Sequence, residues 1–163
     1  MTNTTLTNQN PEITKNYIIQ LLEKLTIDYQ NSKSERQAIA HQFPVSETEF
    51  TLLEEIQLLT TDIRGYASQI KARGYIENTQ QAIKQLKQKR VFDFPNISQL
   101  YLHNSHEYEN IKSYLRMLDY LRLLILEYLT FQQALIKSHA PDAEKVVMII
   151  LCVTLHFLSV TPR

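Results

Sequence analysis

The chain has little of what non-helical folds and nucleotide-binding loops require. Of its 163 residues only two are glycine and five are proline, with no tryptophan and a single cysteine, Cys152. Tight β-hairpins usually need glycine at positive φ, so this composition favours helices over a sheet. Two glycines also exclude the Rossmann fingerprint and the P-loop. One cysteine excludes an intramolecular disulfide, and its apolar neighbours in the sequence predict a buried, unreactive thiol.

An excess of charge of either sign is also absent. Seventeen Lys and Arg residues balance seventeen Asp and Glu residues, so no overall field attracts the chain to nucleic acid or to an anionic membrane. Residues 1–10 are rich in Thr and Asn and contain no Lys or Arg, so no signal peptide is visible. We expect a cytoplasmic protein with a disordered lead at 1–10 and a single helical-bundle domain at 11–163.

The apolar residues repeat with helical periods, which predicts an all-α antiparallel bundle of five to six helices. Asn10 and Pro11 form a typical helix start. After them, apolar residues follow at strict four-residue steps and are expected to face a core. These residues are Ile13, Tyr17, Leu21, Leu25 and Tyr29.

Later helices are expected from similar signals. Ser46 and Glu49 fit a capping box at the start of a helix that Gly74 ends. A polar helix is predicted over 75–90, followed by an aromatic loop in which Phe92 and Phe94 plug the bundle. A long helix is then expected from Asn96 or Ser105 to about His139, and Pro141 is expected to begin the last helix.

The last predicted helix is very apolar. Residues 146–153 are all apolar, and four of the next seven are as well, which leaves no polar stripe at helical spacing. Such a helix must be enclosed by protein or by lipid. The run over 146–160, hereafter the terminal run, is shorter than the roughly 20 residues of a spanning helix and contains His156, which favours a buried core helix. A tail anchor flanked by Lys145 and Arg163 is the alternative.

Arg36 and His41 have the Arg-x4-His spacing found in nucleases of the HEPN superfamily, which are also small helical bundles. The resemblance covers these two residues and would imply RNA cleavage in a cleft at a dimer interface. Gln37 follows Arg36, whereas the family commonly has Asn, Asp or His there and carries the motif late in the chain. These departures place the catalytic assignment of Arg36 and His41 behind a non-enzymatic function.

Other polar groupings are expected to be structural. His103, His106 and Glu107 could offer two imidazoles and a carboxylate to a metal, although a polar surface corner explains them better. Asp119 is the natural partner of Arg122 if that arginine is buried. One basic cluster, Lys84, Lys87, Lys89 and Arg90, lacks the aromatic interleaving of a nucleic-acid surface. We expect no cofactor and no metal.

Several helices carry more apolar surface than a minimal bundle requires, and such surface commonly binds partners. We therefore expect a non-enzymatic protein that acts by protein–protein binding, in an adaptor, regulatory or assembly role, and that associates with itself. Membrane association through the terminal run and RNA cleavage are the alternatives. The residues expected in the core or at an interface are Leu118, Arg122, Ile125, Leu129, Val146, Ile149, Ile150, Val153 and Phe157.

Overall fold

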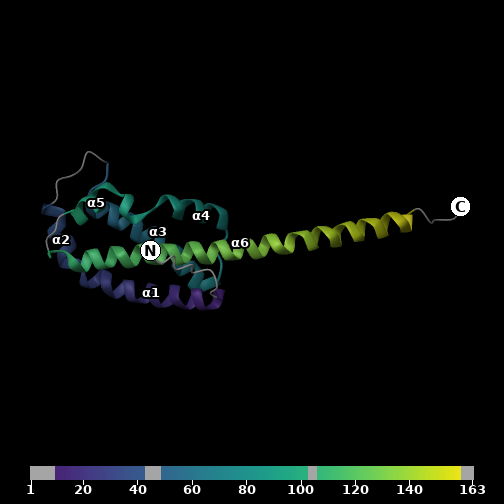
Figure 1. The fold of residues 1–163 in the computed structure, drawn as a ribbon, viewed down its shortest axis with the longest axis horizontal. Coiled ribbons are helices and arrows are strands. Elements are labelled where there is room, and N and C mark those ends of the chain that lie inside the picture. The colour runs from purple at the N-terminus through teal and green to yellow at the C-terminus, as the bar shows by residue number, and fades with distance from the viewer. Residues whose placement is uncertain (1–9, 43–48, 103–105, 159–163) are drawn as a thin grey trace, which may run out of the picture. The chain divides into compact units, whose positions relative to one another are not determined.

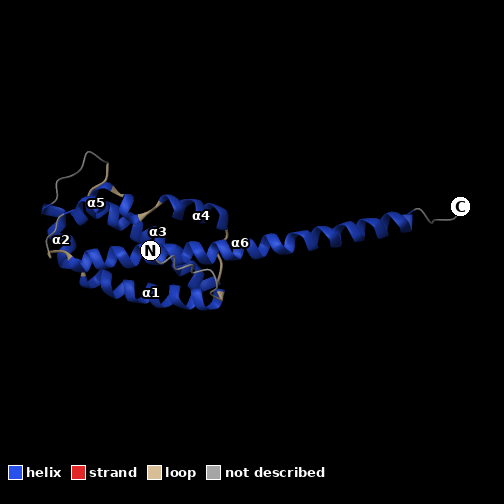
Figure 2. Cartoon of the chain, viewed as in Figure 1, coloured by secondary structure: helices blue, strands red, loops and turns tan. Residues whose placement is uncertain are grey.

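A computed structural model describes the backbone of residues 10–42, 49–102 and 106–158, and the side chains of 10–40, 49–102 and 106–138. These residues form helices and contain no strand (Figure 2), which confirms the all-α prediction. The elements, labelled in Figure 1, are α1 (Pro11–Asn31), α2 (Lys33–Gln42), α3 (Leu52–Arg73), α4 (Thr79–Gln88), the 3-10 helix η1 (Val91–Asp93), α5 (Pro95–Leu102) and α6 (Glu109–Leu158).

The chain divides into two compact units, Met1–Leu129 and Thr130–Arg163. The hydrophobic core described here lies in the first unit and is built from α1 to α5 and the first part of α6. The second unit contains the rest of α6. The prediction of a single domain over 11–163 stays a prediction.

Helix α1 begins as the sequence indicated, but its buried face is rotated. The Asn10 side chain accepts a hydrogen bond from the Glu12 backbone N–H at 3.1 Å. The buried residues are Thr14, Ile18, Leu21, Leu22 and Leu25, whereas Ile13 is 46% exposed and Tyr17 is 51% exposed. The expectation that Ile13 and Tyr17 face the core was wrong, because each four-residue step advances about 40° around a helix with 3.6 residues per turn.

Helix α3 starts later than Ser46. Glu49 and Phe50 are not helical, and the capping box is formed by Thr51 and Glu54, so the placement of the box at Ser46 and Glu49 was wrong. Both segments match the same short pattern, and the one that acts as the cap directly precedes Leu52, the first buried residue of the helix.

The predicted end of α3 is confirmed. Gly74 has φ of 78°, a left-handed value that favours glycine, and its N–H donates to the Ile70 carbonyl at 2.8 Å. Between these ends α3 buries an apolar face, and Tyr66 is partly buried against the same core. The buried apolar residues of α3 are Leu52, Ile56, Leu59, Ile63, Ala67 and Ile70.

The segment after α3 differs in detail from its prediction. The polar helix is shorter than 75–90, because Asn78 caps it by accepting from the Gln81 N–H at 3.1 Å. In η1 it is Val91 that is fully buried, whereas Phe92 is 38% exposed and packs edge-on against Tyr101, with 5.0 Å between ring centroids. Phe92 is therefore not the buried plug that we predicted. Phe94 is partly buried against the core.

Helix α5 begins at Pro95, beside the predicted start at Asn96, whereas α6 begins at Glu109 and the alternative start at Ser105 lies outside the described residues. Each of the two helices is capped by a glutamate from elsewhere in the chain. At the start of α5, Glu55 of α3 accepts from the Asn96 N–H at 3.3 Å and the Ile97 N–H at 3.1 Å. It also accepts from the Asn96 side-chain amide at 2.9 Å. Glu55 is 2% exposed, and its burial raises the pKa of the carboxyl against the lowering effect of these hydrogen bonds.

The start of α6 repeats this arrangement. Glu35 of α2 accepts from the Asn110 N–H at 3.4 Å, the Ile111 N–H at 2.9 Å and the Asn110 side-chain amide at 2.7 Å. In both helices an Asn-Ile pair supplies first-turn N–H groups that have no partner within the helix. Glu35 and Glu55 each lie in the first turn of their own helix, so each carboxylate stands where the positive ends of two helices meet.

Helix α5 is also joined to α6 directly. The Tyr101 hydroxyl donates to the Lys112 carbonyl at 2.6 Å, and burial raises the pKa of Tyr101 to about 12. Tyr101 therefore stays a hydrogen-bond donor at any pH near neutrality.

Helix α6 is continuous from Glu109 to Leu158, so the expected break after His139 and the new helix at Pro141 were wrong. Proline fixes φ near −65°, which is a helical value, so a proline can lie within a helix although it removes one backbone hydrogen bond and its ring crowds the carbonyl four residues earlier. The preference for proline in the first turn of a helix therefore did not predict where a helix begins at Pro141.

Candidate interaction surface

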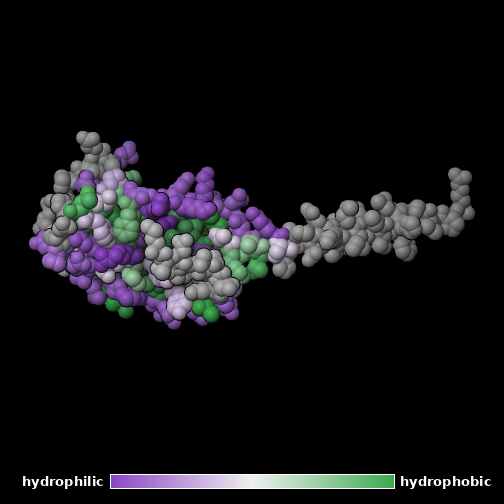
Figure 3. Space-filling model, viewed as in Figure 1, coloured by the Kyte–Doolittle hydropathy of each residue, from purple (hydrophilic) through white to green (hydrophobic). Residues whose placement is uncertain are grey.

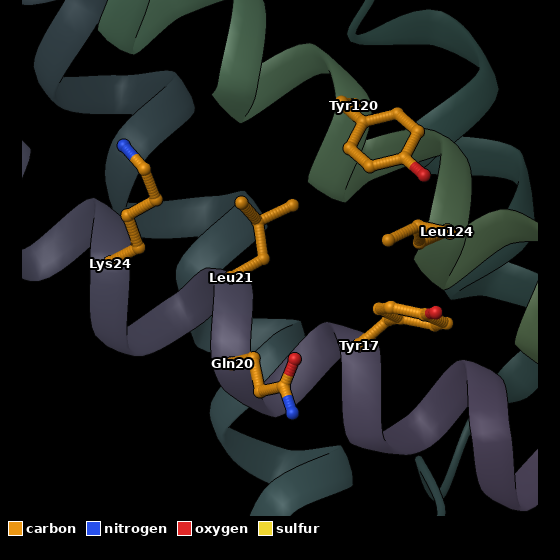
Figure 4. Close-up of a pocket in the computed structure, with 6 residues that line it drawn as sticks. All are labelled: Tyr17, Gln20, Leu21, Lys24, Tyr120 and Leu124. Atoms are coloured by element: carbon orange, nitrogen blue, oxygen red, sulfur yellow. The ribbon is translucent and has the colours of Figure 1, made fainter.

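A groove lies between α1 and α6 in the first unit, with a volume of about 200 Å³. In Figure 4, Tyr17 and Leu21 of α1 point toward Tyr120 and Leu124 of α6. We call this feature the α1–α6 groove. Its lining residues are Tyr17, Gln20, Leu21, Lys24, Tyr120 and Leu124.

The groove has an apolar floor and amphipathic walls. Leu21 and Leu124 are buried, at 7% and 2% exposure, and form the floor. Tyr17 and Tyr120 are about half exposed, at 51% and 46%. Tyrosine offers a large, rigid apolar face together with a hydroxyl, which is why tyrosine is enriched at protein interfaces. The groove can therefore receive apolar side chains and hydrogen-bond a neighbouring backbone.

The rim of the groove carries no unbalanced charge in the described residues that line it. Lys24 is the only charged lining residue, and its ammonium group contacts the Asp28 carboxylate at 2.5 Å, one helical turn further along α1. This pair neutralises Lys24 locally. The groove is consequently suited to an uncharged ligand surface.

The sequence prediction missed this groove because it placed Tyr17 in the core. The four-residue steps that carry Ile13 and Tyr17 away from the buried face also leave Tyr17 beside α6. Each four-residue step turns about 40° around the helix, so the residues do not form one stripe, and this rotation would have indicated a second apolar face at the start of α1.

Figure 3 shows mainly hydrophilic residues on the visible described surface, with smaller hydrophobic patches.

The other apolar positions proposed on the long helix are buried. Leu118, Ile125 and Leu129 have no exposed surface and belong to the core cluster. The remaining five residues of that set, Val146, Ile149, Ile150, Val153 and Phe157, have side chains outside the described residues.

Arg122 is buried, at 5% exposure, and pairs with Asp119 as the spacing indicated. Its Nε donates to Asp119 Oδ1 at 2.8 Å, and its Nη1 donates to the Leu86 carbonyl at 3.0 Å in the last turn of α4. The Val91 N–H in turn donates to Asp119 Oδ1 at 3.4 Å. The pair therefore joins α6 to the end of α4 and the start of η1.

Arg36 is engaged with the end of α1. Its Nη2 donates to the Tyr29 carbonyl at 2.7 Å, its Nε donates to Ser32 Oγ at 3.2 Å, and its guanidinium lies 3.6 Å from the Tyr29 ring centroid. The side chain of His41 is outside the described residues. The structure thus gives Arg36 a packing role at the end of α1.

The residues considered for metal binding do not form a described cluster. His106 and Glu107 are exposed, and His103 is outside the described residues. Among the residues that the structure describes, no group of three or more His, Cys, Asp or Glu side chains could hold a metal ion.

Two residues of the basic cluster have acidic partners. Lys89 forms an ion pair with Asp62 of α3, and Arg90 lies 3.6 Å from Asp93. Lys84 and Lys87 are exposed on α4. The cluster therefore presents less free positive charge than its sequence indicates.

Within the described part of the chain, no helix combines the length and apolarity that crossing a membrane requires. The terminal run, on which the tail-anchor alternative depends, has side chains outside that part. No protein-family model, curated protein or solved structure matches the chain.

Proposed function

We propose that this protein acts by binding another protein, including a second copy of itself, through the α1–α6 groove. The observation that carries the proposal is the pair of half-exposed tyrosines, Tyr17 and Tyr120, above a floor of buried leucines. Aromatic anchors around an apolar pocket are typical of residues that dominate binding energy at interfaces. The role is non-enzymatic, the framework is an antiparallel helical bundle with an apolar C-terminal helix, and the compartment is the cytoplasm.

The geometry favours a helical partner over an extended one. Two helices frame the groove, and no strand edge is present among the described residues to accept an added strand. An amphipathic helix that inserts side chains at spacings of three and four residues would fit such a groove.

Charge placed in the groove tests the proposal. Tyr17→Glu and Tyr120→Glu each introduce a carboxylate above the leucine floor without removing a core side chain. We expect both variants to keep their helical circular dichroism and to weaken self-association at least tenfold, as measured by sedimentation velocity over a concentration series. An isolated charge in a desolvated contact has no compensating partner, which is why the effect is large.

Tyr75→Glu is the matched control, because Tyr75 is also 51% exposed but does not line the groove. It should associate like the wild type. Equal behaviour of Tyr17→Glu and Tyr75→Glu would contradict a binding role for the groove.

A further inference from the structure

We infer that a phosphate-type dianion binds between Arg36 and Arg64, beside the tyrosine pair Tyr29 and Tyr114. We call this place the arginine site. It shares no residue with the α1–α6 groove, so the inference goes beyond the proposed function, and either can fail without the other.

The first argument is that these two arginines lack the acidic partners that the other described arginines have. Four arginines elsewhere in the described part of the chain each lie 2.8 to 3.8 Å from a carboxylate, in the pairs Arg73–Glu77, Arg90–Asp93, Arg116–Glu109 and Arg122–Asp119. Within that same part, Arg36 and Arg64 form no ion pair, and both are half-buried. A partly buried charge is costly without a counter-charge, so the two guanidinium groups favour an external anion.

The second argument is that helix contacts bring both arginines to the same tyrosines. The Arg36 guanidinium lies 3.6 Å from the Tyr29 ring centroid, and the Tyr29 centroid lies 5.3 Å from that of Tyr114. The Tyr114 hydroxyl shares a 3.0 Å hydrogen bond with the hydroxyl of Thr60. Arg64 follows Thr60 by four positions on α3, so the two side chains are neighbours on one face of that helix.

Thr26 makes a second connection between Arg64 and the tyrosines. Arg64 Nη2 donates to Thr26 Oγ1 at 2.6 Å, and Thr26 lies three positions before Tyr29 on α1. The electrostatics agree with this proximity. Burial raises the pKa of Tyr114, and the positive charges of Arg64 and Arg36 act against that rise, as does the hydrogen bond with Thr60. Both guanidinium groups therefore lie near the Tyr114 side chain.

The third argument is the supply of unused donors. Arg36 uses Nε and Nη2 on Ser32 and the Tyr29 carbonyl, and its Nη1 makes no hydrogen bond to a described residue. Arg64 uses only Nη2, and its buried Nε has no hydrogen-bond partner among the described residues. A bound oxyanion would supply acceptors to such donors.

The chemistry of the donors selects the ligand. Guanidinium forks match the oxygens of phosphate and bind them bidentately. Two guanidinium groups carry two positive charges, which a phosphate dianion balances and a single carboxylate does not. The Tyr29 hydroxyl, which makes no hydrogen bond to a described residue, can donate to a further oxygen.

Calorimetric titration of the full-length protein with inorganic phosphate tests the inference. Sodium chloride holds the ionic strength constant, so general screening cannot imitate binding. We expect saturable binding of one phosphate per chain, and about tenfold weaker binding of acetate, which has one charge. Phenyl phosphate in the same titration shows whether the site prefers a phosphate monoester or the free anion. The absence of saturable phosphate binding up to millimolar concentration would overturn the inference, as would acetate binding as tightly as phosphate.

Variants locate the binding. Arg64→Gln and Arg36→Gln each remove one charge and should each weaken phosphate binding about tenfold, the usual worth of a hydrogen bond to a charged group. Arg73→Gln is the matched control, because it makes the same change on α3 at an arginine that Glu77 already pairs. It should bind phosphate like the wild type, and equal affinities of Arg64→Gln and Arg73→Gln would contradict the site.

Circular dichroism checks that each variant is folded. If an arginine variant is not, Tyr29→Phe takes its place, because it removes only a hydroxyl and keeps the ring that Arg36 covers. Tyr29→Phe should weaken phosphate binding about threefold, and an unchanged affinity would exclude the tyrosine pair from the site. None of these results depends on the oligomeric state, which is what tests the α1–α6 groove.

Discussion

The starts of the helices in this protein are capped in two different ways. Helices α1 and α4 are capped by neighbours in the sequence, Asn10 and Asn78, and their caps are exposed. Helices α5 and α6 are capped by Glu55 and Glu35, which come from helices that precede them by many residues in the chain. Local caps stabilise one helix each, whereas caps from a distance also fix how two helices meet.

Burial separates the two distant caps from each other. Glu55 is almost fully enclosed, while Glu35 is half-buried and next to the exposed Asn110. When an enclosed acceptor is removed, water does not easily replace it for the N–H donors, whereas donors near the surface can turn to water. The same hydrogen-bond pattern should therefore have different energetic weight in the two places.

The largest effect is expected at the buried pair that closes the end of α4. Arg122→Ala removes the donor to the Leu86 carbonyl and leaves Asp119 without its cation. Breaking a buried ion pair by removing one partner typically costs about 3–5 kcal/mol, so we expect a loss of about 3 kcal/mol in the free energy of unfolding. Urea denaturation at one fixed protein concentration measures it. A loss below about 1 kcal/mol would show that Arg122 only fills space.

The comparison of the two glutamate caps comes next. Glu55→Ala removes the buried acceptor of the Asn96 and Ile97 backbone N–H groups and should lower the free energy of unfolding by about 2–3 kcal/mol. Glu35→Ala should cost about 1 kcal/mol, the usual value of a cap near the surface. Urea denaturation of both variants gives the difference. Equal losses would show that burial does not distinguish these caps.

The next smaller loss of stability is expected at a local cap. Asn78→Ala removes the acceptor for the Gln81 N–H at the exposed start of α4 and should cost about 1 kcal/mol or less. Substitution by Gly should cost only a few tenths, because glycine leaves the backbone open to water. If the Ala variant instead matched Glu55→Ala in urea denaturation, the distinction between local and distant caps would be lost.

The smallest effect is a dependence on pH. Burial raises the folded-state pKa of Glu55 above its ordinary value of 4.5, so the folded protein binds this proton more tightly than the unfolded chain. Its contribution to stability is complete below 4.5 and is lost as the pH rises through the folded-state pKa. Relative to Glu55→Gln, the wild type should gain stability as the pH falls from about 7 toward 4.5.

Paired urea titrations at several pH values measure this change, and subtracting the variant removes the contribution of the other carboxyl groups. A wild type that loses stability relative to Glu55→Gln on acidification would mean that the two helix ends outweigh burial and lower the pKa.

Local signals in the sequence predicted the features that they control. Asn10, Gly74 and the Asp119–Arg122 spacing each act within one helical turn, and the structure has all three. The pattern at Ser46 was equally local but had a rival at Thr51, and only the position of the buried Leu52 decides between them.

Features that depend on packing between distant segments were not predictable in the same way. Glu35 and Glu55 look like ordinary first-turn acids, and nothing near them in the sequence indicates that each caps another helix. Tyr17 was misplaced because its spacing alone does not show where the buried face of α1 ends. The α1–α6 groove was missed for the same reason, because it is formed only when α1 and α6 pack side by side.

The most direct test of the account is the mass of the full-length wild type in detergent-free buffer, measured by light scattering on a sizing column from high to low micromolar concentration. Self-association through the α1–α6 groove predicts twice the chain mass, which falls toward the monomer on dilution. A monomer at every concentration would contradict self-association through the groove.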